Sequence, residues 1–288
     1  MKILVTGASG HLGARAVNEL RIANEVHAVM RANPTIALSG VTYHTVDLSR
    51  DWSTKVLPDH IDAVIHLAQS RNFREFPQQA FEIFKVNVES TAKLLDYAFR
   101  AGARRFVLAS TGGLHRLSES VIGECSPVDL PDGPLAYYFQ SKHAAELLAV
   151  PYKDLMDISV LRPFFIYGPG QPPDKLIARL LASVRGGERI KLAGRDGLVI
   201  NPVFVDDAVA LLLSILDKPG SRTLMVAGPD ALSIREIADA IGKQVGRDPV
   251  YEHTEDDEGR LIADHRSAET LLGRPMTRFL DGISRLLR

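Results

Sequence analysis

Short apolar runs alternate with amphipathic helical patterns through the first half of the chain. The runs are rich in β-branched residues, which favour strands, and the segments between them carry apolar residues three and four positions apart, which favour helices. This alternation indicates repeated β–α–β units around a parallel sheet with helices on both faces. We predict strands at Lys2–Thr6, Glu25–Met30, Val41–Thr45, Ala63–Leu67, Phe106–Ala109 and Ser159–Arg162, and the longest helix at Phe81–Ala101.

The pattern loosens from Pro163 onward. Gly168–Pro173 is rich in glycine and proline and predicts a turn. Lys175–Arg185 has helical spacing, and a short strand is expected near Val199–Val205. The second half therefore predicts a smaller, mixed lobe that follows a doubly wound parallel sheet.

The length of the chain, 288 residues, is roughly twice the commonest domain size. We expect residues 1–162 to form the main domain and residues 163–288 to form mainly the second lobe. Residues 195–215 are expected to return to the main domain.

The composition is that of an ordinary globular protein, with 45% hydrophobic and 24% charged residues and a net charge of -1. This balance predicts no nucleic-acid or membrane partner. The single cysteine, Cys125, excludes an internal disulfide and a cysteine-based metal site, so we expect no metal. The chain opens on a predicted strand, with no leader ahead of it, and no apolar run is long enough to span a bilayer. We expect a cytoplasmic protein.

A glycine-rich turn joins the first strand to the first helix and reads Thr6-Gly-Ala-Ser-Gly-His-Leu-Gly13. Gly7 permits a tight turn, Gly10 allows the backbone to approach a diphosphate, and Gly13 allows close packing of helix and strand. The N-terminus of the helix attracts the phosphate charge. The turn predicts a Rossmann-type domain that binds a dinucleotide.

The end of the second strand bears on which dinucleotide is bound. Proteins that prefer NAD place an acid there to bind the ribose hydroxyls, whereas this chain has Met30 followed by Arg31. Arg31 can pair with a 2′-phosphate, so we expect NAD(P) with a preference for NADP, although Arg31 can also be an ordinary exposed residue. Asp47, after the third strand, can receive the adenine amino group or simply begin a turn. His66 ends the fourth strand and is given no chemical role, because it can equally be a satisfied buried residue.

Tyr138 and Lys142 lie four residues apart, on one face of a predicted helix. A phenol is a weak base at neutral pH, but a nearby ammonium stabilises the phenolate and lowers the pKa of the phenol. Lys142 can also hold the nicotinamide ribose. Tyr137 lies on a different face and is expected to pack or to line the substrate cleft.

Two hydroxyl residues, Ser110 and Thr111, follow the fifth strand, at the edge where open α/β sheets bind their ligands. We expect Thr111 to donate the hydrogen bond that polarises the substrate oxygen, with Ser110 as the alternative. Capping of local backbone groups is another possible role for either hydroxyl.

With these motifs in place, the sequence resembles the extended short-chain dehydrogenase/reductase family, in particular its NAD-dependent epimerase/dehydratase branch. TGASGHLG matches the family's TGxxGxxG, and Tyr138 and Lys142 match its YxxxK, with Thr111 at the Ser/Thr of the catalytic trio. Asn87 within VNVEST, LRPFFIYGPG, the FVDDA segment and the closing LLGRP agree as well. The resemblance covers nearly the whole chain.

The resemblance implies hydride transfer between a secondary hydroxyl or ketone carbon and a nicotinamide. Tyr138 would be the general acid/base, Lys142 would lower its pKa and Thr111 would orient the reacting oxygen. The expected cofactor site comprises Gly7, Ser9, Gly10, His11, Leu12, Gly13, Arg31, Asp47, Leu48, Leu67, Ala68, Asn87, Ser110, Tyr138, Lys142 and Pro163. The expected substrate site comprises Gln69, Thr111, Gly112, Tyr138 and Phe165. Family members pair through long helices, which here would be those around Phe81–Ala101 and Tyr138–Val150, so a homodimer is expected.

Two departures from the family narrow the reaction. Sugar dehydratases carry an Asp-Glu pair after the catalytic hydroxyl residue, whereas this chain has Gly112-Gly113. Many nucleotide-sugar epimerases have an arginine before the VDD segment that grips the substrate diphosphate, and this chain reads Ile200-Asn-Pro202. Dehydration is disfavoured, and the assignment of a nucleotide sugar is weakened.

Three hypotheses for the function follow. The first is an oxidoreductase or epimerase that acts on a small-molecule substrate, a sugar or nucleotide sugar. The second is an NADPH-dependent reductase of a non-sugar carbonyl compound. The third is a binding protein that senses NAD(P) without turnover, which the intact trio of Thr111, Tyr138 and Lys142 argues against.

Overall fold

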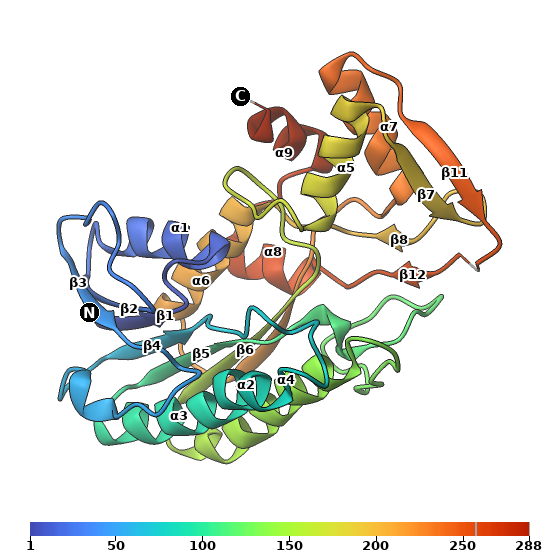
Figure 1. Ribbon diagram of the computed structural model, residues 1–288. Helices are drawn as coiled ribbons and strands as arrows, with labels where there is room; N and C mark the ends of the chain where they lie inside the picture. Colours follow the sequence, from blue (N-terminus) through green and yellow to red (C-terminus); the bar gives the residue numbers. More distant parts are fainter. Residues whose placement is uncertain (257, 288) are drawn as a thin grey trace. The chain divides into compact units, whose positions relative to one another are not determined.

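A seven-stranded sheet organises the first part of the protein, whose computed structural model describes residues 1–256 and 258–287 (Figure 1). The strand order is β3-β2-β1-β4-β5-β6-β9. Each of the five consecutive pairings from β3 to β6 is parallel. The strands are β1 Lys2–Thr6, β2 Glu25–Met30, β3 Val41–Thr45, β4 Ala63–His66, β5 Arg105–Ala109, β6 Asp157–Pro163 and β9 Arg222–Val226.

The strand order reverses between β1 and β4. The chain runs outward from β1 to β3 and then returns to place β4 on the other side of β1. The crossover connections therefore leave this point in opposite directions, and in open α/β sheets ligands bind at such a point, outside the carboxyl ends of the strands. The predicted α/β class and doubly wound sheet are confirmed.

Helices cover both faces of this sheet (Figure 1). One face is packed by α3 (Ser90–Arg100) and α4 (Ala136–Ala149), whose Leu94, Leu95 and Ala145 share a buried apolar cluster with Phe106 of β5. The other face carries α1 (His11–Leu20) and the later residues of α6 (Val205–Asp217). Because both faces are covered, strands such as β4 are buried along their whole length and read as continuous apolar runs.

The helix predicted at Phe81–Ala101 lies in the expected place but is interrupted. It consists of α2 (Ala80–Phe84), a π-helical turn (Lys85–Glu89) and α3. A π turn holds one more residue than an α turn and is commonly found at functional sites. Here it places Asn87 inward, where Asn87 is buried.

The chain divides into two compact units. Unit 1 comprises residues 1–114, 129–162 and 209–224, and unit 2 comprises residues 115–128, 163–208 and 225–288. The division after residue 162 lies where the sequence pattern loosens. The segment that rejoins unit 1 is 209–224, later than the expected 195–215, and 115–128 groups with unit 2.

Unit 2 is a mixed lobe with its own core. Its elements are α5 Leu176–Gly186, β7 Arg189–Ala193, β8 Val199–Ile200, β10 Leu232–Ser233, α7 Ile234–Val245, β11 Val250–Thr254, β12 Arg260–Leu261, α8 Arg266–Leu272 and α9 Phe279–Leu286. The strands form two small sheets, β10-β8-β12 and β11-β7. Ile177, Leu192 and Ile237 pack together in its apolar core. The strand expected near Val199–Val205 is shorter, because Val205 already begins α6.

Candidate active site

The turn between β1 and α1 depends on glycine at two positions. Gly7 has φ +68°, and a Cβ there would lie 2.7 Å from the backbone nitrogen of Ala68 at the end of β4. A Cβ on Gly13 would lie 2.1 Å from the carbonyl oxygen of Gly7. Helix α1 starts at His11 with Gly10 as its N-cap, so no side chain caps the first amide groups. This turn fits the diphosphate of a dinucleotide, since backbone N–H groups are available and no side chain blocks the approach.

The residues after β2 and β3 point less clearly to a cofactor site than the glycine turn does. Arg31 is exposed beyond the end of β2. Asp47 uses its Oδ1 to accept hydrogen bonds from the Ser49 amide at 3.0 Å and the Ser49 hydroxyl at 2.7 Å, and these contacts, together with the charge of Arg50, lower its pKa. Asp47 therefore begins a turn, which is one of the two roles considered for it.

Thr111, Tyr138 and Gln69 converge at the carboxyl edge of the sheet. The Tyr138 phenol donates a hydrogen bond to Gln69 Oε1 at 3.0 Å and shares another with the Thr111 hydroxyl. Thr111 Oγ1 in turn accepts from the Gly113 amide at 3.1 Å. The two hydroxyls expected to face the reacting oxygen are therefore adjacent, and a side-chain amide lies within hydrogen-bonding distance of the phenol.

Lys142 lies one helical turn from Tyr138 and is equally buried, with exposed fractions of 3% and 8%. Its ammonium donates a hydrogen bond to the carbonyl oxygen of Ala109, the last residue of β5. This contact fastens helix α4 to the sheet next to Ser110 and Thr111.

Burial controls the acid–base properties of both groups. It raises the pKa of Tyr138 to about 12, against the opposing effect of the Thr111 hydrogen bond. It lowers the pKa of Lys142 to about 8, against the opposing charge of Glu146. The expected effect of Lys142 on the pKa of Tyr138 stays a prediction: desolvation of the phenol is the largest influence on that pKa here, and the ammonium is hydrogen-bonded to the Ala109 carbonyl.

The β5 edge also contains an unpaired polar atom. Ser110 Oγ is buried and, among the described residues, has no hydrogen-bond partner. Buried hydroxyls rarely stay unpaired in folded proteins, so this group fits a bound ligand such as the nicotinamide ribose or the substrate. Gly112 and Gly113 follow, and a Cβ on Gly113 would lie 2.2 Å from the Phe139 ring, which leaves no room for an acidic side chain.

Asn87 links helix α4 to the segment that follows β4. Its Oδ1 accepts from the Ser70 amide at 2.9 Å, and its Nδ2 donates to Ser141 Oγ at 2.8 Å. Ser141 then donates to the carbonyl oxygen of Tyr138 at 2.7 Å. The expected contact of Asn87 with the cofactor stays a prediction; the π turn places Asn87 where its side chain joins Ser70 to Ser141.

His66 is a satisfied buried residue, in line with the absence of a chemical role in our prediction. Its Nδ1 lies 2.6 Å from Thr6 Oγ1 and its Nε2 lies 3.0 Å from Thr91 Oγ1. Burial and the charge of Lys142 lower the pKa of His66 to about 3, so the ring is neutral. Neutral His66 contributes no charge to the site.

The segment after β4 supplies aromatic residues that the sequence analysis did not assign. Phe73 packs against Tyr138 with ring centroids 4.9 Å apart, and Phe76 stacks on Tyr137 at 4.7 Å. No sequence signal pointed to these contacts, because the segment lacks helical or strand periodicity. Tyr137 packs, as expected for the neighbour of the catalytic tyrosine.

The remaining predicted residues are placed as follows. Leu48 is buried, Leu67 and Ala68 are partly buried after β4, and Ser9, His11 and Leu12 belong to the glycine turn and the start of α1. Pro163 and Phe165 belong to unit 2 and remain predictions. Phe165 has φ +48°, an unfavourable conformation for an aromatic residue.

Asn201, in the Ile200-Asn-Pro202 segment ahead of the VDD residues, has its hydrogen bonds filled. Its Nδ2 donates to the carbonyl oxygens of Gly228 at 3.0 Å and Ala263 at 2.8 Å, and its Oδ1 accepts from the Ala263 amide at 3.1 Å. Asn201 therefore joins three segments of unit 2 and is committed to structure.

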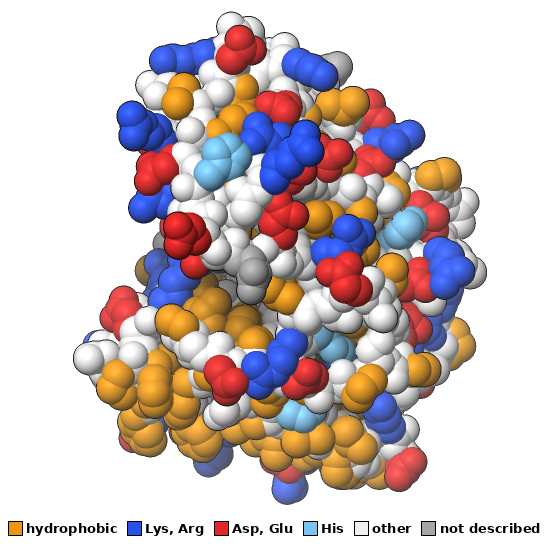
Figure 2. All heavy atoms as spheres, turned by 90° about the vertical axis from the view of Figure 1, so that its right-hand side faces the viewer, with side chains coloured by type: hydrophobic (Ala, Val, Ile, Leu, Met, Phe, Trp, Pro, Cys, Tyr) orange, Lys and Arg blue, Asp and Glu red, His pale blue; other side chains and the backbone are white. Residues whose placement is uncertain are grey.

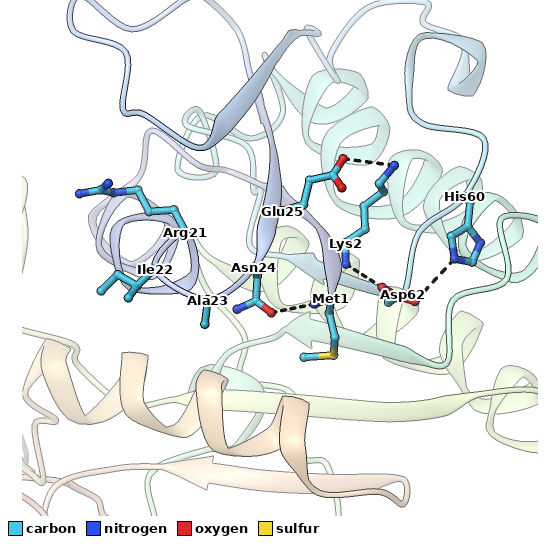
Figure 3. A pocket seen from close by; sticks show the side chains of 9 residues that line it. All are labelled: Met1, Lys2, Arg21, Ile22, Ala23, Asn24, Glu25, His60 and Asp62. Atoms are coloured by element: carbon cyan, nitrogen blue, oxygen red, sulfur yellow. Dashed lines mark hydrogen bonds and ion pairs between the residues drawn. The ribbon is translucent and has the colours of Figure 1, made fainter.

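A shallow pocket with a volume of about 680 Å³ lies at the opposite, amino-terminal edge of the sheet (Figure 3). Its polar groups pair with one another: the Lys2 amide donates to Asp62 at 2.6 Å, and the Lys2 ammonium lies 3.2 Å from Glu25. Because ligands of open α/β sheets bind at the carboxyl edge, we assign this pocket no role. In the described part of the chain, no helix has both the length and the apolar character to cross a membrane.

The fold and the site together define an oxidoreductase of the extended short-chain dehydrogenase/reductase type. The sequence profile of the NAD dependent epimerase/dehydratase family matches residues 3–227, and the chain belongs to this family.

Three similar proteins share 27–30% of their residues with this chain. UDP-glucuronate 4-epimerase of Thermodesulfobacterium geofontis is 27% identical, over 85% of this chain and 80% of that protein. dTDP-glucose 4,6-dehydratase of Streptomyces antibioticus is 29% identical, over 100% and 91%. MoeE5, solved in complex with UDP-glucuronic acid and NAD, is 30% identical with a TM-score of 0.85, over 100% of this chain and 98% of MoeE5.

The Asn87 linkage gives a first prediction. Asn87→Ala leaves the buried Ser70 amide without its acceptor, and we expect a loss of about 1–3 kcal/mol in the free energy of unfolding. Urea unfolding measures the change. Asn18→Ala, on the exposed face of α1, is the control and should change stability by less than about 0.5 kcal/mol. Equal stability of the two variants would mean that Asn87 does not join the segments.

Proposed function

We propose that this protein uses a bound nicotinamide dinucleotide to oxidise a secondary hydroxyl of a nucleotide sugar and then returns the hydride to the same carbon, as an epimerase. The convergence of Thr111, Tyr138 and Lys142 at the carboxyl edge of the sheet carries the proposal. The activities of the relatives support the choice of substrate class, since two of them act on nucleotide sugars.

The residues proposed to hold the cofactor lie mostly in unit 1. The glycine turn would hold the diphosphate, Asp47 and Leu48 would border the adenine, and Leu67, Ala68 and Ser110 would line the nicotinamide side. The nicotinamide, when bound, accepts and returns the hydride. Gln69, Gly112 and Phe165 are proposed to border the substrate.

The three catalytic side chains would divide the proton chemistry. Tyr138 holds its proton at neutral pH because burial raises its pKa to about 12, so it is ready to donate that proton to a ketone oxygen. In the oxidative direction the reacting form is the phenolate, which accepts the proton of the substrate hydroxyl and gives the same proton back to the ketone oxygen when the hydride returns. Thr111 then stabilises the phenolate by hydrogen bonding, and the Lys142 ammonium supplies positive charge one helical turn away.

An epimerase fits this site better than a dehydratase. Dehydration needs an acid and a base beside the catalytic hydroxyl, and Gly112 and Gly113 stand there, with Phe139 filling the space. The second candidate is an NADPH-dependent reductase of a non-sugar carbonyl compound. It is favoured by Arg31 and by Asn201, whose side-chain hydrogen bonds are made to the backbone of unit 2. A reductase consumes free NADPH stoichiometrically, whereas an epimerase retains its dinucleotide and shows no net consumption. A cofactor sensor without turnover has no need of the buried trio.

The role of Tyr138 is tested by Tyr138→Phe. We expect turnover of UDP-glucuronic acid or UDP-glucose to fall by roughly 10²–10⁴-fold, because the proton donor is lost, with dinucleotide binding unchanged. Tyr137→Phe is the matched control and should keep most of the activity, since its ring packs on Phe76. Comparable activity of the two variants would exclude Tyr138 as the acid/base. If the unaltered protein acts on no nucleotide sugar, the substrate class is wrong.

Arg31 supports our proposal that NADP is preferred over NAD, although the MoeE5 complex contains NAD. A guanidinium after β2 can bind a 2′-phosphate in a bidentate manner. We expect the stripped protein to bind NADP more tightly than NAD, and Arg31→Ala to weaken NADP binding about tenfold while NAD binding stays constant. Calorimetric titration with both dinucleotides measures this. Tighter binding of NAD by the unaltered protein would show that Arg31 is an ordinary surface residue.

A homodimer is also proposed. Large apolar side chains are exposed on α2, α3, α4 and the residue after α4; this apolar helical face consists of Phe81, Phe84, Phe99, Leu147, Leu148 and Val150. Figure 2 shows hydrophobic side chains gathered along the lower part of that view, where α3 and α4 lie in Figure 1. Contiguous apolar patches are rarely left open to water, and a second copy would cover this one.

The single, exposed cysteine supports our proposal of a cytoplasmic location.

Leu147→Glu tests the dimer. We expect the variant to run as a monomer in size-exclusion chromatography with light scattering, because a carboxylate would be buried between the two copies. Leu280→Glu, an exposed position on α9 in unit 2, is the control and should leave the mass unchanged. A monomeric unaltered protein, or a dimeric Leu147→Glu, would contradict the proposed interface.

A further inference from the structure

Glu146 is a buried acid for which the proposed reaction has no use. It lies on α4 four residues after Lys142 and eight after Tyr138, so all three side chains share the face that packs on the sheet. The other buried residues on this face, such as Ala145 and Ala149, join the apolar cluster of the sheet. A carboxylate in such surroundings needs a partner.

The partner is Arg162, near the end of β6. Its Nε donates to Glu146 Oε1 at 3.0 Å and its Nη2 donates to Glu146 Oε2 at 2.6 Å. The side chains are 8% exposed for Arg162 and 9% for Glu146. Arg162 projects from the face of β6 that also presents Ile158 and Val160 to the cluster beneath α4, since strand side chains alternate.

Two polar contacts therefore fasten α4 to neighbouring strands, one turn apart. Lys142 bonds to the carbonyl of Ala109 on β5, and Glu146 bonds to Arg162 on β6. The two strands are locked in register there, because Ala109 pairs with Leu161 and the Ser110 amide donates to the Leu161 carbonyl at 2.7 Å. The ion pair and the catalytic lysine thus share one rigid frame.

Stability alone does not account for the ion pair. Buried ion pairs can often be replaced by apolar side chains without loss of stability, because desolvation offsets the attraction. A carboxylate four residues from Lys142 can also form a direct salt bridge with the ammonium. In this protein Arg162 donates to both carboxylate oxygens of Glu146, and the Lys142 ammonium donates to the Ala109 carbonyl instead.

We propose that Glu146 and Arg162 are a positioning pair for Lys142: Glu146 holds a negative charge one turn behind the ammonium, and Arg162 keeps that charge from drawing the ammonium away from β5. The role rests on the proposed function, in which Lys142 serves Tyr138. The other ionisable groups around Lys142 are Tyr138, which holds its proton, and His66, which is neutral.

Substitutions of the two members of the pair should shift the Lys142 titration in opposite directions. Burial lowers the pKa of Lys142 to about 8, and Glu146 opposes this effect. Glu146→Gln removes the opposing charge, so the midpoint of the Lys142 titration should move to lower pH by about 1 pH unit. Arg162→Lys replaces the bidentate guanidinium by a single ammonium, which cannot bind both carboxylate oxygens of Glu146 in the same way. Glu146 can then pair with Lys142, so the midpoint of the Lys142 titration should move to higher pH.

The measurement is the pH titration of the Lys142 side-chain signal by NMR, on full-length protein labelled with carbon-13 lysine. The signal is identified by its absence from Lys142→Arg. Glu89→Gln, which breaks the half-buried ion pair with Lys93 on the same layer of helices, is the control and should leave the midpoint unchanged. Thermal unfolding shows that each variant is folded.

Opposite shifts in Glu146→Gln and Arg162→Lys support the positioning pair. An unmoved midpoint in folded Glu146→Gln overturns it, as do shifts of the same sign, which indicate a purely structural contact. Glu146→Gln alone decides the matter if Arg162→Lys does not fold. Because the titration needs no substrate, it is independent of the proposed function: if the shifts occur but no nucleotide sugar is turned over, the positioning role stands and the proposed function fails.

Discussion

The inner face of α4 imposes the constraint on which the site depends, because it buries three ionisable side chains where a helix usually buries apolar ones. Tyr138, Lys142 and Glu146 must each find a partner in a medium of low dielectric constant, and an unpaired group there would cost several kcal/mol. The partners come from Thr111, from the carbonyl of Ala109 and from Arg162. The helix cannot slide or rotate without breaking these contacts, and the phenol is therefore fixed over the carboxyl edge of the sheet.

The same burial sets the chemistry. Desolvation disfavours both the phenolate of Tyr138 and the ammonium of Lys142, so it raises one pKa to about 12 and lowers the other to about 8. A phenol that keeps its proton is suited to donate it to a ketone. The residues that adjust these values, Thr111 and Glu146, are also the residues that hold the helix in place.

Much of the fold could be predicted because two signals are local in the sequence: the residue composition of the strands and the spacing of residues along a helix. The strands β1, β2 and β3 were predicted with their bounds unchanged: β1 and β2 are largely buried apolar runs, and the partly buried β3 is rich in β-branched residues. Tyr138 and Lys142 show their shared face in their spacing. The π turn at Lys85–Glu89 could not be predicted, because Asn87 is turned inward by partners distant in sequence, Ser70 and Ser141. The Glu146–Arg162 pair was missed for the same reason.

The account is tested most directly by the absorbance of the bound nicotinamide. The purified protein, loaded with dinucleotide at equal concentration, is mixed with UDP-glucuronic acid or UDP-glucose, and reduction of the nicotinamide is followed together with the sugar products. The account predicts transient reduction, formation of an epimer and no net consumption of dinucleotide, with none of these in Tyr138→Phe. Failure of both nucleotide sugars to reduce the cofactor, together with stoichiometric consumption of NADPH by a non-sugar carbonyl compound, would contradict it.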